Sequence, residues 1–143
     1  MSVKAILKTK GRKVITIRPG TTIREAVALL TSERIGAVVV SDDDLTIAGI
    51  LSERDIINAL NKHGAELLEL RAAELMTQSV TAAKIDMHID QVLEIMTQGR
   101  FRHMPVVEDG HLVGIVSIGD AVKARLEMLE NETNQLKEYI FAR

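Results

Sequence analysis

The chain of 143 residues contains no cysteine and few aromatic residues: two Phe, one Tyr and no Trp. Without cysteine it can form no disulfide, thiolate metal site or cysteine nucleophile, and the composition fits a reducing compartment. The scarcity of aromatic side chains leaves little surface on which nucleic-acid bases could stack. A formal net charge of −2 also argues against a general nucleic-acid-binding protein.

Long apolar runs are missing as well. The amino-terminal stretch MSVKAILKTKGRKV has no run long enough for a signal peptide, and no later run is long enough to span a bilayer. We therefore expect a cytoplasmic protein without a membrane segment. With 46% hydrophobic and 27% charged residues, the composition is that of one globular domain or two small halves.

The chain contains an internal repeat. The stretch VITIRPGTTIREAVALLTSERIGAVVVS from Val14 aligns with VTAAKIDMHIDQVLEIMTQGRFRHMPVV from Val80, a shift of 80 − 14 = 66 residues. After a turn that is one residue shorter in the second copy, GILSERD at 49–55 aligns with GIVSIGD at 114–120. Matching apolar positions on both sides of this turn indicate a duplication.

Each copy predicts the element order β-α-β-β-α. A short β-rich stretch (VITI, VTAA) precedes a helix with apolar residues at helical spacing, and Thr22-Ile23-Arg24-Glu25 is a capping-box pattern. The runs AVVV and TIAGIL, then HMPVV and LVGIV, predict strands buried on both faces. The expected fold class is α/β (α+β). Because a half of this size buries too little surface alone, we expect two repeats packed sheet to sheet around a crevice.

The expected boundaries are a first repeat at 1–62, a helical connector at 63–78, a second repeat at 79–126 and a carboxyl-terminal helix extension at 127–143. The connector should pack against the fold, because its leucines need burial. These leucines are Leu67, Leu68, Leu70 and Leu75.

The extension carries a stripe of residues that step by 4, 3, 4, 3 and 4: Val122, Leu126, Leu129, Thr133, Leu136 and Ile140. This spacing predicts either a coiled-coil seam or a helix packed along its own domain, and in both cases the stripe is buried. The core of the second repeat should end near Ala124.

Serine and aspartate recur where a buried strand gives way to a helix: Ser52 with Asp55, and Ser117 with Asp120. The structural interpretation is a helix N-cap with a carboxylate in the first turn. The functional interpretation is that ligands collect beyond the carboxyl ends of strands, where an aspartate can accept hydrogen bonds from two neighbouring hydroxyls, as in a ribose diol.

The stretch GRFRHMPVV adds a cluster of cations next to the second of these ends. Arg102 and His103 can bind phosphate, and the first repeat has Gly36 and Ala37 instead. Arg100 fits a structural role at a helix end, because Arg34 holds the same place in the first repeat. We expect the Asp120 site to be the better phosphate site.

The repeat, the paired G-[IV]-[LV]-S-x-x-D ends and RHMPVV together resemble a tandem CBS-domain protein (a Bateman module) of the small stand-alone bacterial type. The resemblance implies a non-catalytic regulatory module that binds an adenine nucleotide between the repeats, with AMP and NAD(H) as first guesses and ATP or S-adenosylmethionine as further ones. It also implies a homodimer and an unidentified protein target.

The resemblance assigns site residues as follows. The ribose would be held by Asp120 and Ser117, and at a second site by Asp55 and Ser52. The adenine would lie near Thr77, Val80, Thr81, Met104 and Pro105, and in the first cleft near Lys13 and Val14. Phosphate would meet Arg102, His103 and Arg54, the last reaching across.

Three alternatives stay open at this point: an interaction scaffold without ligand, an RNA-binding protein that uses Arg100 and Arg102, and an enzyme acting on nucleotides. No metal site is expected. Asp42-Asp43-Asp44 lacks the glycine and glutamate spacing of a calcium loop, so we interpret it as a solvated hairpin turn.

Overall fold

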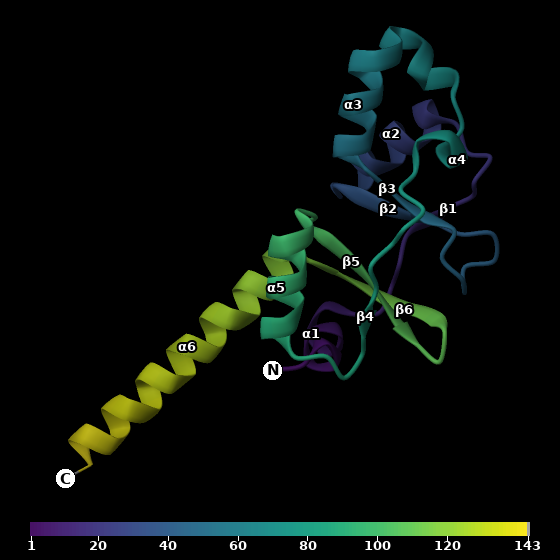
Figure 1. Cartoon of the computed structure of the whole chain (residues 1–143). Helices are drawn as coiled ribbons and strands as arrows, with labels where there is room; N and C mark the ends of the chain where they lie inside the picture. Colours follow the sequence, from purple (N-terminus) through teal and green to yellow (C-terminus); the bar gives the residue numbers. More distant parts are fainter. Residues whose placement is uncertain (143) are drawn as a thin grey trace. The chain divides into compact units, whose positions relative to one another are not determined.

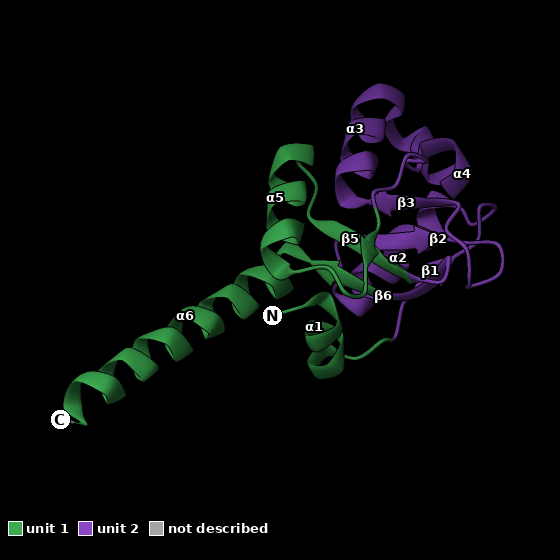
Figure 2. Cartoon of the chain, turned by 60° about the horizontal axis from the view of Figure 1, so that its bottom comes forward, with its two compact units in different colours: residues 1–12, 82–107, 114–143 green, residues 13–81, 108–113 purple. Residues whose placement is uncertain are grey.

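The structure is a computed structural model that describes residues 1–142 and divides into two compact units. Unit 1 contains residues 1–12, 82–107 and the chain from 114 onward, and unit 2 contains residues 13–81 and 108–113 (Figure 2). The elements of the first half are α1 (Val3–Lys10), β1 (Thr16–Ile17), α2 (Ile23–Glu33), β2 (Ala37–Val40), β3 (Gly49–Ser52), α3 (Glu53–His63), a 3-10 helix (Gly64–Glu69) and α4 (Ala72–Leu75). Those of the second half are β4 (Ala83–Lys84), α5 (Ile89–Gly99), β5 (His103–Glu108), β6 (His111–Ser117) and α6 (Ile118–Phe141) (Figure 1).

The predicted duplication and the order β-α-β-β-α are confirmed. Both ends of α5 follow those of α2 by 66 residues, since 89 − 23 and 99 − 33 are equal. The strand register repeats too: Ile17 pairs with Val40 in parallel, and Ala83 pairs with Val106 in the same way. Each three-stranded sheet therefore has the same order, β1-β2-β3 and β4-β5-β6.

Burial on both faces is found only in the central strands. All four residues of β2 are buried, whereas buried and half-exposed residues alternate in β3 and along most of β6. The expectation of strands buried on both faces was therefore wrong for β3 and β6. These strands lie at the edges of their sheets, and only one face of each is buried. The short strand expected at VTAA begins later, at Ala83.

Unit 2 is built around one apolar cluster. Nine buried residues form it: Ile17, Ile23, Ala26, Leu30, Val38, Val40, Leu51, Leu67 and Ala72. The connector packs on this core as expected, with Leu68, Leu70 and Leu75 partly buried against it. The connector consists of a 3-10 helix followed by the one-turn helix α4. The expected helical connector is therefore made of two short helices and not of one continuous helix.

Helix α1 belongs to unit 1, together with the second repeat, although it precedes the first repeat in the chain. Val3 N donates to Met87 O at 2.9 Å and Lys4 N donates to Ile85 O at 2.9 Å. Helix α4 has the matching place in unit 2, where Ile23 N donates to Leu70 O at 2.9 Å. In the compact units of the structure, α1 thus groups with the second repeat, and α4 takes the equivalent place beside the first.

A glycine in the outer strand permits each of these helices to approach closely. A Cβ on Gly114 of β6 would lie 2.7 Å from Leu7 Cδ2 of α1. A Cβ on Gly49 of β3 would lie 2.6 Å from Met76 Sδ, just after α4. The two glycines are equivalent in the repeat. At each of them, a side chain from or next to the helix fills the space that a Cβ would occupy.

The buried residues of α6 lie in its first two turns. Ala121 and Ala124 are its buried residues, so the core of the second repeat ends where expected. The five apolar residues of the stripe are between 42% and 60% exposed in this single chain. Figure 1 shows the yellow end of α6 extending beyond the remainder of unit 1. The interpretation of α6 as packed along its own domain was therefore wrong.

Gly114→Ala should destabilise the fold. The added methyl group must displace Leu7, which is 1% exposed, and overpacking of this kind costs about 1–3 kcal/mol in the free energy of unfolding. Urea denaturation followed by circular dichroism measures it. Gly20→Ala is the control, because a Cβ there meets no heavy atom within 4 Å. Equal stability of the two variants would contradict the close packing of α1 on β6.

Candidate functional site

The serine–aspartate pairs at the strand ends form capping boxes. In unit 1, Asp120 N donates to Ser117 Oγ at 3.1 Å, and Ser117 N donates to Asp120 Oδ2 at 2.9 Å. In unit 2, Asp55 N donates to Ser52 Oγ at 3.3 Å, and Ser52 N donates to Asp55 Oδ2 at 2.9 Å. The structural interpretation of all four residues is thus confirmed. Each aspartate is held in place at a helix N-terminus.

Lys10 is the partner that sequence reasoning missed. Its Nζ lies 2.6 Å from Asp120 Oδ2 and also donates to Ile115 O at 2.9 Å. The lysine belongs to the last turn of α1, and Asp120 to the first turn of α6. Lys10 lies before the aligned repeat, so no pattern in the sequence pointed to this pair.

The charge of Asp120 is set by opposing effects. Burial raises the pKa of Asp120, but the hydrogen bond from Lys10, the hydrogen bonds from Ser117 and the charge of Lys10 outweigh it. The pKa of this carboxyl therefore lies below its ordinary value of 3.8, and Asp120 is an anion at neutral pH. Its side chain is 25% exposed, which leaves part of the carboxylate open to solvent.

The predicted cationic stretch begins beside the same helix end. Ile118 N donates to Arg102 O at 2.8 Å, so the residue before β5 is tied to the start of α6. Arg102 is exposed and His103 is half-buried, whereas Met104 and Pro105 are buried. The structure thus brings Arg102, Ser117 and Asp120 to one end of unit 1, and only the first two residues of RHMP keep exposed surface.

Arg100 has the structural role that the repeat suggested. Both Arg34 and Arg100 are C-cap residues in the left-handed backbone region, with φ of 54° and 56°. Their amides donate back to Leu30 O and Met96 O. The matching backbone geometry shows that the two helices end in the same way at these arginines.

The Asp55 site of unit 2 has a different second partner. Thr77 Oγ1 lies 3.4 Å from Asp55 Oδ1, and Ser52 Oγ lies 3.0 Å from Asp55 Oδ2. The resemblance placed Thr77 near the adenine, and that role stays a prediction. In the structure its hydroxyl contacts Asp55, because the chain after α4 pairs with β3 through Ile50 and Thr77.

The remaining predicted site residues are scattered over unit 2. Arg54 is exposed in the first turn of α3. Lys13 is exposed and Val14 half-buried in the segment before β1, and Val80 and Thr81 follow the pairing segment as coil. Their predicted roles toward adenine and phosphate stay predictions.

The acidic turn between β2 and β3 is a self-contained loop. Asp43 Oδ1 accepts hydrogen bonds from Leu45 N at 2.9 Å and Thr46 N at 2.8 Å. These bonds lower the pKa of Asp43 to about 2. Arg18 and Thr16 bind Asp44. The interpretation as a hairpin turn is confirmed. Across residues 1–142, no three His, Asp or Glu gather into a possible metal site.

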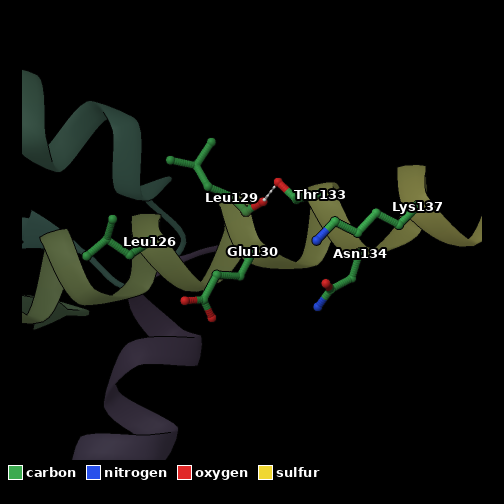
Figure 3. Close-up of a pocket in the computed structure, with 6 residues that line it drawn as sticks. All are labelled: Leu126, Leu129, Glu130, Thr133, Asn134 and Lys137. Atoms are coloured by element: carbon green, nitrogen blue, oxygen red, sulfur yellow. Dashed lines mark hydrogen bonds between the residues drawn. The ribbon is translucent and has the colours of Figure 1, made fainter.

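A hollow on the surface lies along one face of α6. Figure 3 shows its lining residues, all from this helix: Leu126, Leu129, Glu130, Thr133, Asn134 and Lys137. Thr133 Oγ1 donates to Leu129 O at 2.9 Å, which turns the threonine hydroxyl toward its own helix. Because one helix supplies every wall, the hollow is an open groove and encloses no ligand.

In the described chain, no helix is both long and apolar enough to cross a bilayer.

The fold and the strand ends together define a duplicated α/β module with one aspartate-capped helix terminus per copy. The family model for the CBS domain matches residues 3–62 and 72–127. The chain therefore belongs to the CBS-domain family, and the resemblance to tandem CBS-domain proteins is confirmed.

Solved structures and curated proteins agree with this assignment. The CBS-domain containing protein ATU1752 from Agrobacterium tumefaciens has a TM-score of 0.85 and 47% identity, over 87% of this chain and 99% of that one. The CBS-domain containing protein YhcV of Bacillus subtilis is 28% identical over 82% of this chain and 83% of its own length. Both relatives thus match over more than four fifths of this chain and of their own length.

A third similar structure is known with ligands. It is the CBS domain pair of protein MJ0100, in complex with 5′-methylthioadenosine and S-adenosyl-L-methionine. It has a TM-score of 0.79 and 28% identity, over 90% of this chain and 98% of that chain. Adenosine-containing ligands are therefore bound by a CBS pair of this fold.

Asp120→Asn should make the fold less stable at pH 7, by about 1 kcal/mol in the free energy of unfolding. The pKa of Asp120 is lower in the folded than in the unfolded chain, so its ionised form stabilises the fold above 3.8. This contribution disappears as the pH falls through the lower folded value. Thermal unfolding between pH 7 and pH 2.5 measures it, with Asp55→Asn as the capping-box control. A deficit that does not shrink at low pH would contradict the pair with Lys10.

Proposed function

We propose that this protein is a non-catalytic regulatory module that binds an adenine nucleotide, with AMP and NAD(H) as first candidates and ATP as a further one. The observation that carries the proposal is the end of unit 1, where Asp120 is fixed by a capping box and the backbone of Arg102 is bonded to the same helix. The bound adenosine ligands of the MJ0100 CBS pair support it.

The chemistry of the two strand ends supports a sugar and phosphate ligand. An ionised aspartate accepts two hydrogen bonds from vicinal hydroxyls, and a guanidinium binds phosphate through paired N–H groups. Unit 1 presents Asp120 together with exposed Arg102 and half-buried His103. Unit 2 presents Asp55 with Ser52 and Thr77, and has Gly36 and Ala37 in place of the two cations.

The functional consequence is sensing of energy or redox state, read by a protein target. A second copy of the chain is part of the proposal, because the stripe on α6 is exposed in the single chain. A cytoplasmic location also belongs to it, on the ground of the cysteine-free composition. A scaffold without ligand, an RNA-binding protein and a nucleotide-converting enzyme are the alternatives that the experiment must separate.

Isothermal titration should show binding of AMP or NADH to the wild-type chain. Asp120→Ala should weaken it about tenfold or more, because one charged hydrogen-bond acceptor is lost. Asp55→Ala is the matched control, since it removes the same capping box from unit 2. If Asp55→Ala is as damaging as Asp120→Ala, the better site is not at Asp120.

Several outcomes would favour the alternatives. Wild-type protein that binds none of AMP, ATP, NADH and S-adenosylmethionine at millimolar concentration favours the scaffold and overturns the proposal. Binding that bulk RNA displaces, with steep salt dependence, favours the RNA-binding alternative. A new product after incubation with the nucleotides favours the enzyme.

A further inference from the structure

The exposed apolar stripe of α6 has the heptad spacing of a coiled coil. In heptad notation, Leu126, Thr133 and Ile140 are a positions, and Val122, Leu129 and Leu136 are d positions. Each of the five apolar residues is at least 42% exposed, and the hollow in Figure 3 follows the same face. Apolar surface in a continuous seam of this kind needs a covering partner.

The charges beside the seam identify the partner and its direction. In a parallel pair, a g residue of one helix faces the e residue five places later in the other helix. Arg125 then faces Glu130, and Glu132 faces Lys137, so both pairs are of opposite charge. In the antiparallel pair that overlaps all six a and d layers, with Leu126 opposite Leu136, Glu130 faces its own copy and Glu132 does the same. Lys123 then faces Lys137, and Arg125 faces the uncharged Tyr139.

We propose that α6 pairs with α6 of a second copy of this chain as a parallel, in-register two-stranded coiled coil. The parallel arrangement has two attractive pairs, whereas the antiparallel arrangement that overlaps all six layers has none. This inference deepens the proposed homodimer and is independent of ligand binding. Thr133 is the one polar layer, and its hydroxyl is bonded to its own backbone at Leu129 O.

Cysteine cross-linking of the full chain tests the direction, because the natural chain has no cysteine. Leu126→Cys and Ile140→Cys are separated by 140 − 126 = 14 residues, or about 21 Å along the helix. Each single variant should cross-link to itself with a short thiol-reactive linker. Asn131→Cys, on the outer face, is the control and should give no dimer.

Two results would overturn the parallel pair. One is failure of both single variants to cross-link. The other is cross-linking of Leu126→Cys only when it is mixed with Leu136→Cys, which is the antiparallel pattern. Glu132→Lys should raise the dimer dissociation constant about tenfold, and Glu132→Lys with Lys137→Glu should restore it. A double variant as weak as the single one also contradicts the pairing.

A different observation, the contact of Lys10 with Asp120, leads to a second inference. The ammonium lies 2.6 Å from the carboxylate oxygen that also accepts from Ser117 N. A ligand diol that binds Asp120 must compete with this ammonium. A nucleoside offers the displaced lysine no new partner, whereas the phosphate of a nucleotide does, and the flexible four-carbon side chain can follow it.

We infer that Lys10 sets the preference of the Asp120 site for nucleotides over nucleosides. This inference rests on the proposed function. In unit 2 the corresponding neighbour of Asp55 is the uncharged Thr77, at 3.4 Å, so that site lacks the same discrimination. Lys10 is therefore a specificity-determining residue of unit 1 that the motif at the strand end does not contain.

Titration of adenosine and of AMP into wild type, Lys10→Met and Lys8→Met tests this role. Lys8 is an exposed lysine in the same last turn of α1, which makes it the control for helix charge. In Lys10→Met, the preference for AMP over adenosine should fall about tenfold, because adenosine loses its competitor and AMP loses a cation. Lys8→Met should keep the wild-type ratio.

The two ways of failing are distinct. If wild type binds AMP and adenosine but all three proteins give the same ratio, the role of Lys10 is wrong and the proposed function stands. If wild type binds neither ligand, the proposed function is wrong, and the role of Lys10 is overturned with it.

Discussion

The close contact of a helix with a glycine of an outer strand organises each unit. At Gly114 it seats α1 on β6, and at Gly49 it seats the end of α4 on β3. Because α1 precedes the first repeat in the chain, this contact ties the amino-terminal residues to the second repeat. It also extends the last turn of α1 toward α6, and so brings Lys10 to Asp120. The packing of Leu7 on Gly114 thereby helps to bring the charge of Lys10 to the candidate site.

The aspartates at the strand ends serve structure and chemistry at once. Each carboxylate accepts the amide of the N-cap serine, which orients it and keeps one oxygen engaged. A group held in this way loses little freedom when a ligand binds, since its conformation is already ordered. The repeats differ in the next neighbour, an ammonium at Asp120 and a hydroxyl at Asp55. The two repeats therefore hold their aspartates in the same backbone geometry, but only Asp120 has a cationic neighbour among these contacts.

Much of the fold could be predicted from the sequence, because its determinants are local. Apolar spacing located α2 and α5, and the capping patterns located the starts of α2, α3 and α6. The same patterns identified Ser117 and Asp120 as a pair. One expectation was wrong where neighbours decide, because the outer strands are buried on one face only. Neighbours also decide that Thr77 contacts Asp55, through its pairing with β3.

The sequence by itself determined the duplication, the order of elements and the heptad seam of α6, since each depends on residues a few positions apart. Only the tertiary structure decided which repeat receives α1, that Lys10 meets Asp120, and that the seam lies open. Those outcomes depend on contacts between distant segments; Lys10 and Asp120 are 110 residues apart. No local periodicity encodes such a contact, because it exists only once the intervening chain has folded.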